Sequence, residues 1–206
     1  MAVYSSELET VLRKFINSSG GKGGDKLREL LKNESVDSRY ELLMNVRGVR
    51  NSTFTALHAG AVANDLESIR HLCDGFSASQ KCDAVQLQAI GTERTALHFA
   101  AVAGYTSIIN YLLSDLSQQQ KYDLLKLKNE YGNTPLHLAT IHNYVKTVEA
   151  IKSSVALPLL TQLLNIENNE EKTVTEIRPE LYNKPTLAIS QGNAGLLIMY
   201  LYLVKS

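Results

Sequence analysis

The sequence TALHFAAVAGY, residues 95–105, decides the fold because the chain uses it three times. Forty positions earlier the chain reads TALHAGAVAND (55–65), and thirty-nine positions later it reads TPLHLATIHNY (134–144). Three copies at a near-constant spacing indicate one structural unit that is repeated along the chain.

The residues at the start of this stretch predict a short helix. Thr95 is a helix N-cap residue, because its hydroxyl can accept a hydrogen bond from a free amide of the first turn. In the third copy Pro135 occupies the first helical position, where its missing N–H is not needed. Leu97, Ala100 and Ala101 lie three to four positions apart and therefore share one face of the helix.

The end of the stretch predicts a helix stop and then a second helix. Gly104 stands where a left-handed residue ends the first helix, and the other copies have Asn64 and Asn143 at this place. The apolar stripe of the second helix consists of Ile108, Ile109, Leu112 and Leu113.

These motifs resemble the ankyrin repeat, whose signature is a turn, then Thr-Pro-Leu-His-x-Ala, then glycine and a second helix. The copy at 134–139 matches the signature fully, and the copies at 55 and 95 differ from it in lacking the proline. The resemblance implies an all-α solenoid of stacked helical repeats that binds proteins.

The period of 39 to 40 residues exceeds the 33 residues usual for ankyrin repeats, and the extra length has a regular sequence. A basic residue, a ring or thiol, an acid and two apolar residues follow each second helix in the same order. These segments are residues 38–43, 80–85 and 120–125. We expect a short third helix in each unit, capped by Ser35 or Asp37, by Ser77 or Ser79, and by Ser117.

The same register predicts a degenerate unit at each end of the three clear repeats. Ser6 to Glu9 form a capping box, and we expect Asp25 to cap a second helix. Near the other end we expect an acidic loop, then a first helix from Pro185 to Gly192 and a second helix from Gly195 to Val204. The predicted divisions of this single domain are 1–46, 51–88, 91–128, 130–168, 169–182 (the loop) and 183–206.

Composition restricts the class of partner. Lys and Arg total 21, as do Asp and Glu, so the formal net charge is zero, which argues against nucleic acid and anionic membrane surfaces as partners. The first residues lack a signal-peptide layout, and the apolar run from Leu196 to Val204 is too short to span a bilayer. We expect a cytoplasmic protein with Cys73 and Cys82 reduced, and a secreted effector that acts inside a host cell stays an alternative.

No catalytic, cofactor or metal site is expected from the motifs. The glycine-rich segment at 20–24 lacks the spacing of a phosphate-binding loop, and the common nucleophile and zinc motifs are missing. His58, His98 and His137 occupy the same position in successive units, so stacking would hold them roughly one helix diameter, about 10 Å, apart. We expect these imidazoles to bridge backbone groups within and between repeats. We therefore expect no cofactor, no metal and no small-molecule substrate.

The resemblance implies that a protein partner binds the concave face formed by turn tips and the ends of first helices. On this chain the corresponding turn positions are Asn51, Ser52, Phe54, Gly91, Thr92, Arg94, Glu130, Tyr131 and Asn133, and the helix positions are Val62, Ala63, Val102, Ala103, Ile141 and His142. Phe54, Arg94 and Tyr131 are the candidate anchors, because aromatic residues and arginine dominate binding energy at interfaces.

Three readings of function remain open from the sequence. The first is a non-catalytic interaction module or scaffold. The second is a regulator or effector that blocks a specific cellular or host target through the same face. The third is the interaction segment of a larger protein that carries a catalytic domain elsewhere. The predicted helix at 195–204 is apolar nearly all round, which suggests further repeats or an association at that end.

Overall fold

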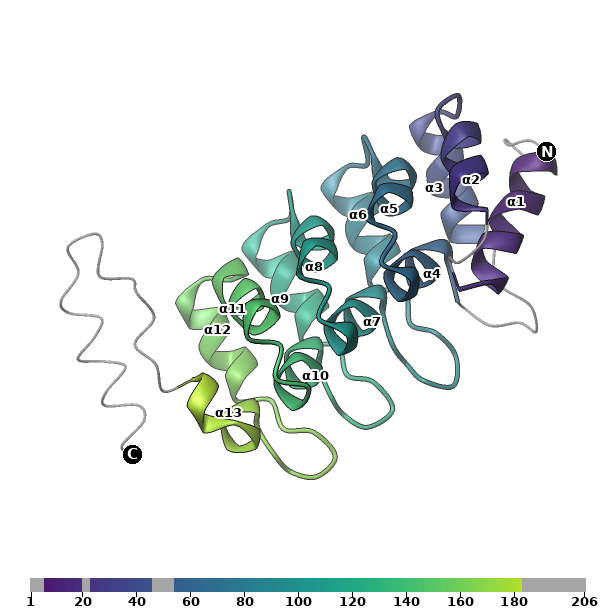
Figure 1. The fold of residues 1–206 in the computed structure, drawn as a ribbon. Coiled ribbons are helices and arrows are strands. Elements are labelled where there is room, and N and C mark those ends of the chain that lie inside the picture. The colour runs from purple at the N-terminus through teal and green to yellow at the C-terminus, as the bar shows by residue number, and fades with distance from the viewer. Residues whose placement is uncertain (1–5, 20–22, 46–53, 183–206) are drawn as a thin grey trace.

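The computed structural model describes residues 6–19, 23–45 and 54–182 of the 206-residue chain. The α-helices in this part are stacked side by side in one row, with no β-strand among the described residues (Figure 1). The expected all-α solenoid is confirmed. The candidate residues Asn51 and Ser52 and the two helices expected after Pro185 lie outside the described residues.

Each repeating unit consists of three short helices. The first helices are α1 (Ser6–Asn17), α4 (Ala56–Ala63), α7 (Ala96–Ala103) and α10 (Pro135–Ile141). The second helices are α2 (Gly24–Leu31), α5 (Leu66–Cys73), α8 (Thr106–Leu113) and α11 (Val145–Ser154). The third helices are α3 (Val36–Asn45), α6 (Ala78–Val85), α9 (Gln118–Leu125) and α12 (Leu157–Leu164). The extra helix per repeat is therefore confirmed.

Equivalent helices of neighbouring units pack against one another. Helix α7 lies between α4 and α10, and α8 contacts both α5 and α11. Leu57, Leu97 and Leu136 of the first helices are fully buried, as are Ile109 and Leu112 of the second helix α8. Each unit thus hides its apolar face against the next, and neither face would be covered in an isolated unit.

The third helices α3, α6 and α9 begin at serine caps, which explains their fixed position, whereas the N-cap of α12 is Ala156. Gln80 N–H donates to Ser77 Oγ over 3.2 Å, and Ser77 N–H donates to Gln80 Oε1 over 3.0 Å. The same reciprocal pair joins Ser117 and Gln120 at the start of α9. These capping boxes satisfy amides that a helix start otherwise leaves free. Ser35 takes this role at α3, accepting from Ser38 N–H over 3.1 Å.

Two local expectations are wrong. Asp25 does not cap α2, because the helix begins at Gly24 and Asp25 lies inside its first turn. The N-cap is Gly23, which has a left-handed φ of 89°. Residues 169–182 are not simply an acidic loop, since they contain α13 (Val174–Ile177) and the 3₁₀ helix η1 (Pro179–Leu181). Thr173 caps α13 through a capping box with Glu176, thirty-nine positions after Thr134. The repeat register therefore continues into this segment.

Candidate functional site: the row of turns and first-helix ends

The turns before α10 and α13 are each built around one asparagine side chain. Asn129 Oδ1 accepts hydrogen bonds from the N–H groups of Tyr131 and Asn133, both over 3.0 Å. Asn168 Oδ1 accepts from Glu170 and Lys172 over 3.0 and 3.1 Å. In each case the carboxamide holds a five-residue turn closed, so the residues at its tip have a defined backbone.

Backbone hydrogen bonds join neighbouring turns into one row. Glu130 N–H donates to the carbonyl oxygen of Thr92 over 3.2 Å, and Asn169 N–H donates to that of Tyr131 over 3.1 Å. These turns lie along the same edge of the stack as α4, α7 and α10 (Figure 1). The row is therefore a continuous surface drawn from three units.

Three histidines fix the first helices beneath this row. His98 Nδ1 accepts from Thr95 N–H over 3.1 Å, and its Nε2 lies 3.0 Å from the Asn133 carbonyl oxygen in the next unit. His58 reaches the carbonyl oxygen of Arg94 in the same way over 3.1 Å, and His137 reaches that of Lys172 over 3.2 Å. The imidazoles bridge backbone groups within and between units.

Burial keeps His98 and His137 in the neutral form that this geometry needs. Burial lowers the pKa of His98 from 6.5 to about 4. Burial also lowers the pKa of His137. A neutral ring can accept at Nδ1 and donate at Nε2. Among the described residues, no group of three His, Cys, Asp or Glu side chains is arranged to hold a metal ion.

The structure brings most of the sequence-predicted residues to this surface. Tyr131 is 58% exposed, and Val62 and Ile141 are 37% and 38% exposed. The other exposed positions are Ala63, Gly91, Glu130 and His142, and the half-buried ones are Thr92, Arg94, Val102 and Ala103. Because most of the helix residues are small or aliphatic and most of the turn residues are polar or aromatic, the surface offers both apolar and hydrogen-bonding contacts.

Two of the predicted positions are engaged inside the protein. Phe54 stacks on the His58 ring at a centroid distance of 5.3 Å and meets Phe99 edge-on at 5.7 Å. Asn133 is 9% exposed and its Oδ1 accepts from Asn168 Nδ2 over 3.0 Å. Both side chains therefore hold the turns and first helices in place, which makes Tyr131 and Arg94 the more accessible anchor candidates.

Sequence reasoning missed one prominent residue of the row. Ile90 is 65% exposed, beside Gly91 in the turn that leads to α7. This turn runs from Ala89 to Arg94, closed by a hydrogen bond from Ala89 N–H to the Arg94 carbonyl oxygen, and it is one residue longer than the next two. The extra residue, visible in the sequence by comparing the three turns, is the signal that could have identified it.

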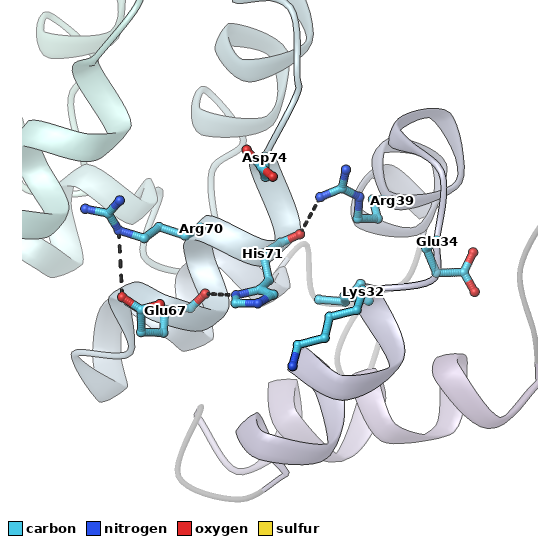
Figure 2. Close-up of a pocket in the computed structure, with 8 residues that line it drawn as sticks. Lys32, Glu34, Arg39, Glu67, Arg70, His71 and Asp74 are labelled. Atoms are coloured by element: carbon cyan, nitrogen blue, oxygen red, sulfur yellow. Dashed lines mark hydrogen bonds and ion pairs between the residues drawn. The ribbon is translucent and has the colours of Figure 1, made fainter.

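A second surface feature is a polar cleft of about 450 Å³ between the first and second units (Figure 2). It is lined by Leu31, Lys32, Glu34, Arg39, Glu67, Arg70, His71 and Asp74. The three Lys and Arg side chains and the three Asp and Glu side chains of this lining balance in charge. Figure 2 shows the Arg39 guanidinium directed to the His71 carbonyl and Arg70 turned toward Glu67.

A structural role accounts for Arg39 in this cleft. Arg39 Nη1 donates to the His71 carbonyl oxygen, near the end of α5, over 2.7 Å. Lys81, at the equivalent place one unit later, donates to the Ser114 carbonyl oxygen over 3.0 Å and lies 4.5 Å from the centre of the Tyr111 ring. In both units a cation from a third helix meets the carboxyl end of the next second helix, where the helix dipole favours positive charge.

The described residues offer no reactive thiol and no spanning helix. Cys73 is buried and free, and burial raises the pKa of its thiol to about 12, so it is protonated at neutral pH. None of the helices in the described ranges has the length and apolar character needed to cross a membrane.

Comparison with known proteins places this architecture in a family. A family model described as ankyrin repeats (3 copies) matches residues 76–158, which extend from just before α6 into α12. No curated protein matches the chain. Ankyrin repeats are generally protein–protein interaction modules, and the fold is typically non-catalytic. The family match over residues 76–158 and the repeated, histidine-linked helical units together show that this chain contains ankyrin repeats.

Proposed function

We propose that the protein is a non-catalytic interaction module that binds a protein partner on the row of turns and first-helix ends. The observation that carries this proposal is the hydrogen-bonded row itself, in which a buried, repeated framework presents side chains that differ between units. Thr95, Thr134 and their histidines are fully buried, whereas the tips carry Ile90 and Tyr131. The framework residues serve the fold, and the tip residues are available for recognition.

The chemistry of this surface suits a protein partner. Exposed aliphatic residues at the ends of α4 and α10 provide area for apolar contact, and Tyr131 provides a large side chain with a polar end. Aromatic anchors surrounded by smaller contacts are the usual arrangement of energetically important interface residues. We also propose a cytoplasmic location, supported by the two unpaired cysteines.

The test is partner recovery by variants of the two surfaces. The chain is used as bait, and the recovered proteins are identified by mass spectrometry. Tyr131→Ala/Ile141→Asp removes two exposed side chains of the row. Ser107→Asp/Asn110→Ala changes two exposed positions of α8, which lies away from the turns.

We expect the partner to be lost with the row variant and retained with the α8 variant. The opposite pattern would refute the assignment of the face. A regulator that blocks a target would inhibit the activity of the recovered partner in a purified assay, and a scaffold would leave that activity unchanged. A longer natural form with a catalytic domain would support the remaining alternative.

A further inference from the structure

The turn that ends at Arg94 lacks a hydrogen bond that the next turn makes. Asn168 Nδ2 donates to Asn133 Oδ1 over 3.0 Å, which ties one turn to the next. The equivalent atom one unit earlier, Asn129 Nδ2, has no partner, although Asn129 is only 3% exposed. The residue in the place of Asn133 is Arg94, whose side chain has no oxygen to accept this bond.

Arg94 gains no compensating bond within the described part of the chain. Its Nε is buried without a partner, and its guanidinium carbon lies 5.9 Å from the centre of the Phe99 ring. Thr92 Oγ1, in the same turn, is also buried without a partner. Buried polar atoms without partners are rare in folded proteins, and here three of them meet at one junction between turns.

The surface around Arg94 combines apolar side chains with a moderate negative charge. Ile90 and Tyr131 are the two most exposed large hydrophobic residues of the described chain, at 65% and 58%. Glu93 and Glu130 are exposed at the tips of the same two turns. No ion pair within the described ranges engages Arg94, so its positive charge is free to meet a ligand.

We infer that Arg94 binds one carboxylate of the protein partner, with Ile90 and Tyr131 receiving apolar side chains beside it. This inference rests on the proposed function and specifies the partner's chemistry. A guanidinium matches a carboxylate through two parallel hydrogen bonds. Glu93 and Glu130 repel additional acids, which selects for a single carboxylate in an apolar setting over a highly acidic segment. Because Arg94 cannot accept a hydrogen bond from the Asn129 amide, the turn is less stable than it would be with asparagine at position 94. We attribute this local loss of stability to the binding role of the arginine.

The experiment compares Arg94→Asn with Lys146→Asn in binding and in stability. Lys146 is an exposed lysine of α11 and controls for the loss of one positive charge. The probe is a displayed library of random peptides, used in one form with a free carboxyl terminus and in another with that terminus blocked. Enrichment of Asp or Glu in both forms assigns a side-chain carboxylate, and recovery of binders only from the form with the free terminus assigns the terminal one.

Arg94→Asn is expected to weaken peptide binding and to raise the stability of the fold. The peptides selected by the wild type should bind at least about tenfold more weakly, since the loss of a charge-assisted contact at an interface costs more than one decade in affinity. The urea midpoint should rise, because the new asparagine can accept from Asn129 as Asn133 accepts from Asn168. Lys146→Asn should change neither quantity. Arg94→Lys should recover only part of the binding, because an ammonium lacks the planar fork.

The results separate this inference from the proposed function. If binders come from both library forms without an enriched acid and still lose binding with Tyr131→Ala, the carboxylate assignment is overturned and the binding face stands. If peptide binding is insensitive to both Arg94→Asn and Tyr131→Ala, the proposed face fails as well. Unchanged or lower stability of Arg94→Asn would overturn the explanation of the missing hydrogen bond.

Discussion

His98 Nε2 lies 3.0 Å from the carbonyl oxygen of Asn133, so a side chain of one repeat closes the turn of the next. The same link recurs from His58 to Arg94 and from His137 to Lys172. Because each imidazole is also held by the threonine cap of its own helix, the position of every first helix is tied to the backbone of the following turn.

This link predicts that the protein loses stability in mild acid. The pKa of His98 is about 4 in the folded chain against an ordinary value of 6.5, because the ring is buried. The unfolded chain therefore binds the proton more readily, and stability that is fully present above pH 6.5 falls as the pH drops toward 4. We expect the free energy of unfolding to decrease by about 2 kcal/mol between about pH 7 and about pH 5 for this residue, and burial of His137 acts in the same direction.

Urea unfolding at the two pH values measures this effect. His98→Gln is the control, because its side chain does not titrate, and its pH dependence should be smaller than that of the wild type. Equal pH dependence of the two proteins would show that His98 does not contribute.

The two turn asparagines allow one hydrogen bond to be measured by comparison. Asn129→Ala and Asn168→Ala each remove a carboxamide oxygen that accepts two backbone hydrogen bonds, but only Asn168 also donates to Asn133. Both variants should be destabilised, and Asn168→Ala should lose about 0.5–1.5 kcal/mol more. Chemical denaturation of the two variants gives this difference, and a larger loss for Asn129→Ala would contradict the bonding pattern.

Gly104 and Gly91 form a second matched pair. Both have a left-handed φ, of 73° and 86°, but a Cβ on Gly104 would lie 2.7 Å from Tyr144 Cδ1, whereas one on Gly91 would meet no atom within 4 Å. Gly91→Ala should cost about 1–2 kcal/mol of stability for the backbone conformation alone. Gly104→Ala should cost about 1–3 kcal/mol more, because the Tyr144 ring must shift.

The additional destabilisation that Gly104→Ala causes through contact with Tyr144 should disappear when the substitution is made in a Tyr144→Ala background. Thermal unfolding of the single and double variants measures it. If Gly104→Ala is no worse than Gly91→Ala, the close contact between Gly104 and Tyr144 is not present in solution.

Coupling between units is tested at Leu112, which is fully buried in α8. Leu112→Ala should lower the free energy of unfolding by about 2–5 kcal/mol through the lost apolar contacts and the cavity that remains. Because α8 contacts both α5 and α11, hydrogen exchange should accelerate in those two helices as well. Asn110→Ala, at an exposed position of the same helix, should change stability by less than about 0.5 kcal/mol. Faster exchange confined to α8 would argue against coupled repeats.

Much of the fold could be predicted from the sequence because its signals are local. The threonine caps, the apolar spacing and the left-handed residues Asn64 and Gly104 lie within one helix of the structure that they specify. The third helices α6 and α9 could be predicted in the same way, since Ser77 and Ser117 each precede the same order of basic, ring or thiol, acidic and apolar residues. Helix α13 was missed because the acidic residues around it obscured the capping box from Thr173 to Glu176, in which a glutamate replaces the histidine.

The candidate site was less predictable because it depends on contacts between units. The sequence placed Tyr131 and Arg94 at turn tips, but it did not show that Phe54 packs on His58 and Phe99, or that Asn133 faces Asn168. Such pairs lie more than thirty positions apart in some cases, and their geometry follows from how the turns stack. The unpaired amide of Asn129 likewise depends on the preceding turn, where Arg94 occupies the position that Asn133 holds one unit later.

The binding face is tested most directly by hydrogen exchange of the chain with and without its recovered partner. We expect slower exchange in the turns at 89–94 and 129–133 and at the ends of α7 and α10, with little change in α5, α8 and α9. Protection centred on the second or third helices, with unchanged exchange in the turns, would contradict the proposed function.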